Sequence, residues 1–229
     1  MSTVAIRRML CLANSRKLSG RCVAGIELTG SNLAAGWLRP VSVRVHEEVS
    51  EYERQYEDGS DPRLLDIIDV PLLEPRPNAY QQENWLLDPD CYWRKEGTTD
   101  AASLSDLVTP PGPLWINGEH SYHGLNDRIP LEVANGLASS LALIRVDDVR
   151  LHVFAPGEAF GNAKRRVHGE FAHAGARYRL WVTDPRYERE YLAQPDGVYP
   201  LGPCFLTISL GEPFDDMVYK LIAGVIPDA

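Results

Sequence analysis

The feature that most constrains the fold is a series of short apolar segments, separated by turn residues, that fills the second half of the chain. The segments are rich in valine, isoleucine and aromatic residues, which is the composition of β-strands. They lie at 141–146, 149–154, 166–171, 177–182, 204–210 and 218–226. The acidic pair Asp147-Asp148 predicts a hairpin between the first two, and 173–176 predicts a hairpin between the next two. Asp184-Pro185 predicts the start of one short helix.

The first part of the chain has the same strand-rich pattern. Apolar segments lie at 4–12, 22–28, 36–41 and 64–73. Asn14–Gly20 is expected to be a loop. The strand that contains Pro40, which has no N–H to donate, is expected to lie at a sheet edge or to be interrupted by a bulge. Ser50 and Glu53 have the spacing of a capping box and predict a short helix.

The run Thr109-Pro110-Pro111-Gly112-Pro113 is the strongest linker signal, because it excludes both regular helix and ladder pairing. We therefore expect an N-terminal domain at 1–110, a connecting segment at 111–139 and a C-terminal domain at 140–229. Five or six short strands with one late helix favour a small barrel over a sandwich. The expected fold is mainly β (β-rich α+β), with two tandem small β-barrels resembling the oligonucleotide-binding (OB) fold and short helices.

Charge is unevenly distributed along this acidic chain, whose formal net charge is −9. Residues 1–45 contain seven basic side chains against one acid, and residues 160–181 contain five against one. Between His46 and Pro110 there are 16 acids and only five bases. The surface is therefore expected to have basic and acidic faces, although ordinary solvated charges explain the same counts.

The cysteines and the hydropathy pattern bear on the compartment. Cys11, Cys22, Cys91 and Cys204 form no C-x-x-C pair, which favours reduced thiols. No apolar run approaches the roughly 20 residues needed to span a bilayer, and the N-terminal residues do not have the pattern of a secretory signal. We expect a cytoplasmic protein that does not enter a membrane.

Several blocks of sequence resemble the bacterial dual OB-containing domain family. They include 11–17, 20–25, 36–42 (Gly-Trp-Leu-Arg-Pro-Val-Ser), 52–56, 82–85, 154–157, 181–184 and 204–213. The resemblance covers nearly the whole chain and implies two OB-like barrels. It also implies a place among prokaryotic conflict or phage-defence genes and a role in sensing or binding nucleic acid.

An OB barrel binds single strands with cations that meet phosphates and with rings on which bases stack. Both halves of the chain contain these residue types, and each tryptophan has the competing interpretation of a core residue. The candidate nucleic-acid-binding residues are Asn14, Ser15, Arg16, Lys17, Arg21, Trp37 and Arg39 in the first half, and Lys164, Arg165, Arg166, His168, Tyr178, Arg179 and Trp181 in the second.

Catalytic motifs are weak. His120 and His123 are three residues apart but have no Cys or carboxylate cluster at zinc-ligand spacing, and there is no G-x-S-x-G. We expect a binding module without enzymatic activity, metal or cofactor, which recognises single-stranded nucleic acid or a nucleotide-like ligand and serves beside a separate effector protein. The alternatives are a protein-interaction adaptor or inhibitor, whose acidic stretch from His46 to Asp106 docks a basic partner, and an enzyme with its site between the barrels.

Overall fold

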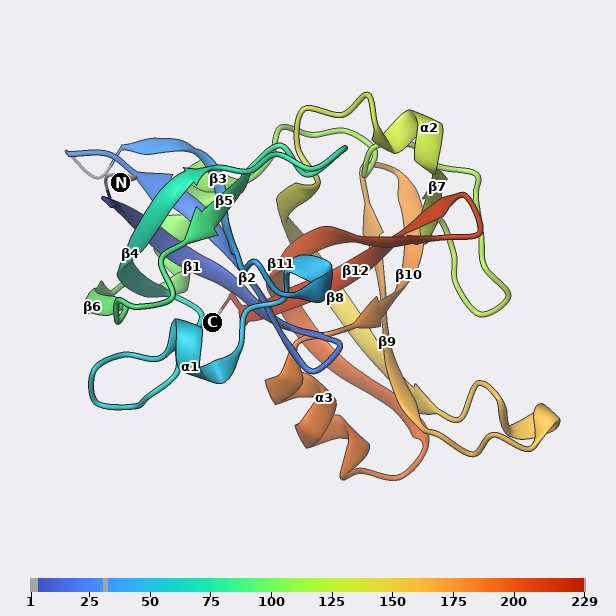
Figure 1. Cartoon of the computed structure of the whole chain (residues 1–229). Coiled ribbons are helices and arrows are strands. Elements are labelled where there is room, and N and C mark those ends of the chain that lie inside the picture. Colours follow the sequence, from blue (N-terminus) through green and yellow to red (C-terminus); the bar gives the residue numbers. More distant parts are fainter. Residues whose placement is uncertain (1–3, 31–32, 229) are drawn as a thin grey trace. The chain divides into compact units, whose positions relative to one another are not determined.

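The computed structural model of the protein describes residues 4–30 and 33–228, and it divides them into two compact units (Figure 1). The first unit contains the chain up to Ser103 together with Leu137–Ser140. The second contains Leu104–Gly136 and the chain from Leu141 onward. Each unit has its own apolar core and its own six-stranded sheet. The expectation of a mainly β fold with two OB-like barrels is confirmed.

Five strands of the second unit close into a barrel with the OB connectivity. They are β8 (Leu141–Phe154), β9 (Arg166–His173), β10 (Ala176–Val182), β11 (Gly197–Phe214) and β12 (Met217–Pro227). The hydrogen-bonded order is β10-β9-β8-β11-β12, and parallel pairing of β10 with β12 closes the ring. Helix α3 (Pro185–Leu192) lies between β10 and β11 in the chain. This is the strand and helix order of an OB fold.

Shorter elements complete the second unit. Strand β7 (Arg128–Pro130) extends the sheet beside β12, and it is followed directly by helix α2 (Leu131–Ala134). A single 3-10 turn, η3 (Glu158–Phe160), lies in the loop between β8 and β9.

The first unit repeats the same connectivity. Its strands are β1 (Ala5–Lys17), β2 (Gly20–Leu28), β3 (Ala34–Val41), β4 (Asp66–Pro75) and β5 (Asn84–Leu87), with β6 (Arg94–Thr98) added beside β4. The order β1-β2-β3-β5-β4 is closed by β1 pairing with β4, and β3 pairs with β5 in parallel. Helix α1 (Glu51–Arg54) and the 3-10 turn η1 (Val45–Glu47) lie between β3 and β4, and η2 (Ala101–Leu107) follows β6.

Both predicted helix starts are confirmed by their caps. The Ser50 side chain accepts a hydrogen bond from the Glu53 N–H, and the Glu53 carboxylate accepts from the Ser50 N–H at 2.8 Å. The Asp184 carboxylate accepts from the Arg186 N–H at 2.9 Å and from the Val225 N–H at 3.1 Å. Asp184 therefore also ties α3 to β12, and its burial raises the pKa of its carboxyl group.

Two local predictions are wrong, each because long-range pairing overrides turn-forming residues. Asn14–Lys17 continue β1 as far as the hairpin turn, because they pair with Gly20–Val23. Asp147-Asp148 is no hairpin turn but the middle of the 14-residue strand β8, where β11 has register shifts. The strand that contains Pro40, β3, has neighbours on both sides and is no edge strand, but a register shift interrupts its pairing with β2, as the bulge alternative predicts. This pairing reaches only to Leu38, so the missing N–H of Pro40 breaks no bond to β2.

The proline-rich run and the residues after it pack on the second barrel. The Thr109 N–H donates to the Leu143 carbonyl at 2.8 Å, and the Leu143 N–H donates to Thr109 Oγ1 at 3.0 Å. Leu114 is a member of the second core. Of the segment predicted to connect the domains, residues 111–136 thus belong to the second unit and Leu137–Ser140 to the first.

A buried lysine lies at one end of the second barrel. Lys220 is fully buried between the core positions Val218 and Ile222 of β12, and its ammonium group donates to the Ile116 carbonyl at 2.7 Å. The Tyr178 ring lies 5.4 Å from its Nζ. Burial lowers the pKa of Lys220 to about 8, against an opposing contribution from Asp127.

We predict that Lys220→Met removes a pH-dependent part of the stability. The unfolded lysine, with a pKa near its usual value of about 10.4, keeps its proton longer than the folded one, so the wild-type free energy of unfolding gains from this group as pH rises from about 8 to 10. The variant lacks that gain. Its stability relative to wild type should therefore fall by about 3 kcal/mol across this range. Urea unfolding of both proteins at pH 7 and pH 10 measures the difference in stability between the variant and wild type. Titration of tyrosines and cysteines cancels in this difference, because both proteins contain them. Parallel pH profiles would refute the prediction.

Candidate nucleic-acid interface

Three consecutive cations with different environments, Lys164, Arg165 and Arg166, lie where the β8–β9 loop (residues 155–165) meets the start of β9. Arg165 pairs with Asp196 at 2.6 Å and donates to the Leu192 carbonyl, so it holds the loop against the end of α3. Lys164 is exposed, and the Arg166 guanidinium lies 5.3 Å from the centroid of the Trp181 ring. Within the described part of the chain, neither Lys164 nor Arg166 has a carboxylate partner. Two of the three cations are thus available to an anion.

An aromatic cluster lies beside these cations on the outer face of the barrel. Strand register places Trp181 opposite His168, and Phe154 opposite Arg166. The His168 ring centroid is 3.5 Å from that of Trp181 and 5.2 Å from that of Phe154. Trp181 and Phe154 are only partly buried, so the predicted ring and the predicted cations of this half do meet.

Two other predicted residues of the second half have different positions. Tyr178 is fully buried inside the barrel, where its hydroxyl donates to Asn117 Oδ1 at 2.8 Å and accepts from the Leu114 N–H. Arg179 pairs with Glu170 at 2.7 Å, and Arg177 pairs with the same carboxylate, whose pKa these cations lower against the effect of burial. Tyr178 therefore offers no exposed ring, and Arg179 shares one carboxylate with Arg177.

The candidates of the first half divide between two places. Asn14, Ser15, Arg16, Lys17 and Arg21 share the β1–β2 hairpin, in which Arg16 faces Arg21. Asn14 Nδ2 donates to the Pro62 carbonyl at 2.8 Å, and Ser15 is buried. Trp37 faces Ile26, five residues along β2 from Arg21 and so roughly 16 Å away. The hairpin cations and the half-buried Trp37 do not form one site.

Arg39 is part of the interior of the first unit. It is 2% exposed, and its guanidinium lies 3.1 Å from Glu83 Oε1 and donates to Ser140 Oγ at 2.9 Å. Glu83 also accepts hydrogen bonds from the N–H and the hydroxyl of Ser140. This buried ion pair attaches residues 137–140 to the first barrel, so Arg39 has a structural position away from solvent.

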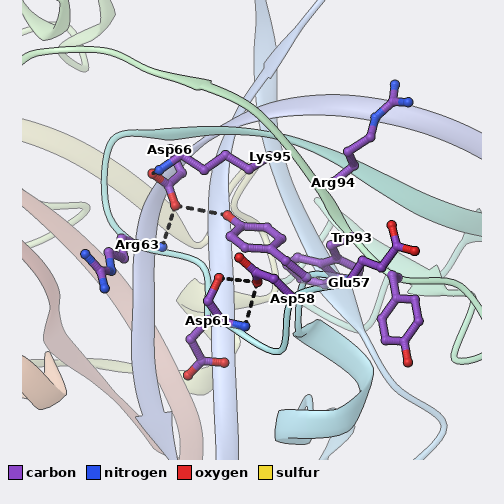
Figure 2. Close-up of a pocket in the computed structure, with 11 residues that line it drawn as sticks. Glu57, Asp58, Asp61, Arg63, Asp66, Trp93, Arg94 and Lys95 are labelled. Carbon is purple, nitrogen blue, oxygen red and sulfur yellow. Dashed lines mark hydrogen bonds and ion pairs between the residues drawn. The ribbon is translucent and has the colours of Figure 1, made fainter.

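The first unit also contains a pocket of about 490 Å³ between the α1–β4 connection and the start of β6. Figure 2 shows its lining side chains, with Asp66 and Lys95 on one side and Glu57, Asp58 and Asp61 around Trp93. Lys95 pairs with Asp66 at 2.6 Å, and the Tyr56 hydroxyl donates to Asp66 at 3.0 Å (Figure 2). Burial and this carboxylate raise the pKa of Tyr56 far above its usual value, so it stays a neutral donor.

Charge makes this pocket a poor site for a polyanion. Four carboxylates (Glu57, Asp58, Asp61, Asp66) line it together with three cations (Arg63, Arg94, Lys95). Arg94 also pairs with Asp69 and Glu96. A phosphate that approached Arg63 would meet the uncompensated charge of Glu57 or Asp58. The loop and cluster of the second unit have no such excess of acid.

Some residues of the second-unit surface were missed at the level of sequence. Phe154 ends a predicted strand, but only the β8–β9 register brings it to Arg166. Phe160 lies in the β8–β9 loop with 80% of its surface exposed, and Tyr122 is 88% exposed beside the cluster. Phe160 could have been found from the sequence, because it lies close to the basic run Lys164–Arg166. Tyr122 and His123 are about 40 residues from that run, and no sequence pattern connects them with it.

Within residues 4–30 and 33–228, no group of three or more His, Cys, Asp or Glu side chains is arranged to hold a metal ion. No helix there has the length and apolar character that crossing a bilayer requires.

The model of a protein family described as the dual OB-containing domain matches residues 7–225, nearly the whole chain. No curated protein matches the sequence.

We predict that Arg39→Met destabilises the first unit. The substitution leaves Glu83 buried without its cation, which typically lowers the free energy of unfolding by about 3–5 kcal/mol. The exposed Arg16→Met should change it by less than about 0.5 kcal/mol. The double variant R39M/E83M should recover much of the loss, since no charge remains buried. Urea unfolding followed by tryptophan fluorescence compares the four proteins, and equal midpoints for R39M and R16M would contradict the buried role.

Proposed function

The chain belongs to the dual OB-containing domain family, and on this basis we propose that its second OB unit binds single-stranded nucleic acid. Lys164 and Arg166 contact the phosphates, and Trp181 with Phe154 stacks on bases. The chain is an OB-type binding module, and this proposal names its ligand class. It excludes a catalytic role for these residues.

The observation that carries the proposal is the position of Arg166 over the Trp181 ring, beside an exposed Lys164 that has no carboxylate partner within the described residues. Unpaired cations next to partly exposed rings are the two components of a sequence-tolerant single-strand site. Stacking on such rings contributes about 1–3 kcal/mol per base, and each phosphate contact adds a salt-dependent contribution.

The position within the barrel supports the same conclusion. OB folds bind oligonucleotides on the face of their second and third strands and with the loop that joins the first strand to the second. In the second unit these are β9, β10 and the 155–165 loop. The corresponding hairpin of the first unit carries Arg16, Lys17 and Arg21.

The acidic segment supports the adaptor alternative less well than its composition suggested. Among its 16 acids, Glu48, Glu53, Asp66, Asp69 and Glu83 are buried and hydrogen-bonded within the first unit. Fewer carboxylates are thus free to meet a basic partner.

As part of the proposal, the protein acts as the sensing or targeting component of a prokaryotic conflict (phage-defence) system, beside a separate effector protein.

We predict that K164A/R166A weakens binding of a fluorescent oligothymidylate. Loss of two phosphate contacts should lower the affinity most at low salt and reduce the slope of log K against log salt by about 1.4, at about 0.7 per contact. Fluorescence anisotropy from 20 mM to 300 mM salt measures both quantities.

R145A/R189A is the matched control, because it removes two positive charges from the same unit outside the proposed site. It should preserve the slope and lower the affinity only slightly. Equal losses in the two double variants would indicate a general charge effect and count against the site.

A further inference from the structure

His168 lies on the outer face of the second barrel and is nevertheless fully buried. Its neighbours in β9, Val167 and Phe171, belong to the barrel core, so His168 points the other way. Neither of its ring nitrogens has a hydrogen-bond partner among residues 4–30 and 33–228. Burial lowers the pKa of His168 to about 3, so the ring is neutral and keeps one unused donor and one unused acceptor.

Aromatic rings form the surroundings of His168. The Trp181 and Phe154 rings are nearly parallel, with an interplanar angle of 13° and centroids 6.1 Å apart. His123 packs edge-on against Phe154 at 5.4 Å, and Tyr122 packs against His123 at 4.7 Å. Two residues from outside the barrel strands thus cover part of the cluster, on the side of Phe154.

Those two residues belong to a covering segment, residues 118–127, that runs beside β10 (Figure 1). Leu125 exchanges backbone hydrogen bonds with Arg179 at 3.1 and 3.0 Å, and Asn126 Nδ2 donates to the Arg177 carbonyl at 2.9 Å. At the other end, His123 Nε2 donates to the Pro156 carbonyl at 2.8 Å. The base of the segment is therefore anchored to β10, and its tip is attached to the β8–β9 loop by a side chain.

The turn that carries Tyr122 and His123 is closed within itself. The Ser121 N–H donates to Asp127 Oδ1 at 2.7 Å, and the Gly124 N–H donates to Ser121 Oγ at 3.1 Å. A Cβ atom on Gly124 would lie 1.9 Å from Asp127 Oδ2, so this close packing requires glycine. Tyr122 and His123 are thus carried by one compact turn, which rests on the buried Asp127 and is attached to the β8–β9 loop by the bond from His123 to Pro156.

We propose that His168, Trp181 and Phe154 form a nucleobase pocket, which the tip of the covering segment closes in the free protein, and that His168 binds the hydrogen-bonding edge of the base. This inference rests on the proposed function. A base that displaces the tip stacks on the exposed rings and supplies the partners that the imidazole lacks. Lys164 and Arg166 lie at the same loop and contact the adjoining phosphates. The site is thus selective for the base as well as for the charge of its ligand.

His168→Phe tests the pocket, because it keeps a ring of similar size and removes both nitrogens. Because the two unpaired imidazole nitrogens are no longer buried, the variant should unfold at higher urea concentration than wild type. Its affinity for oligonucleotides should nevertheless fall about tenfold, the effect of one lost hydrogen bond, and its preference among homopolymers of A, C, G and T should flatten. H173F, the same substitution in the same strand outside the cluster, is the control.

The outcomes separate the two proposals. If H168F binds every homopolymer as wild type does while K164A/R166A is impaired, the base pocket is refuted and the phosphate site stands. If wild-type protein binds no oligonucleotide at low salt, both are refuted. Greater stability together with weaker and less selective binding supports the pocket, since a purely structural histidine would not change the preference among bases.

Two variants test the closure. His123→Ala removes the bond to Pro156 and the contact with Phe154, and Gly124→Ala disturbs the turn at a different atom. Both should raise the association rate several-fold, because a larger fraction of the free protein has an open pocket. Stopped-flow anisotropy measures this rate. Unchanged rates in both variants would show that the covering segment does not close the site.

Discussion

Parallel pairing of the third and fifth strands closes both barrels, and most other features depend on it. The pairing is short, with three registered residue pairs between β3 and β5 and two between β10 and β12. Parallel neighbours cannot be joined by a tight turn, so the chain needs a long crossing connection. In the second unit that connection contains α3, and Asp184 fixes the helix to β12 through the Val225 N–H. Trp181 is one of the two β10 residues that pair with β12, so the pairing that closes the barrel also fixes the backbone that carries the Trp181 ring.

Much of the fold was predictable because periodicity and cap chemistry are local properties. The strand segments after Arg166, the helix start at Asp184 and the capping box at Ser50 are each encoded within a few residues, and each is confirmed. Asn14–Lys17 and Asp147-Asp148 were misread because polar turn-formers remain in a strand when a distant partner offers ladder bonds. That partner is β2 in one case and β11 in the other. No local pattern specifies such a partner.

The candidate site was predictable to a smaller extent. The sequence identified the basic run Lys164–Arg166 and Trp181, because cations beside a strand with aromatic residues are visible in one dimension. It did not separate these from Tyr178 and Arg39, since alternation along a strand gives two faces without stating which one is buried. The ion pair of Arg39 with Glu83 and the contact of His123 with Phe154 link residues more than 30 positions apart, beyond the reach of any motif.

The path of the chain has a practical consequence for anyone who dissects this protein. Leu137–Ser140 returns to the first unit after the chain has already entered the second, so neither compact unit is one continuous stretch of polypeptide. A gene fragment that stops in the proline-rich run would encode a first barrel whose Glu83 carboxylate has lost the Ser140 hydroxyl. Expression of isolated halves therefore requires a fusion that restores this four-residue insert, or co-expression of both pieces.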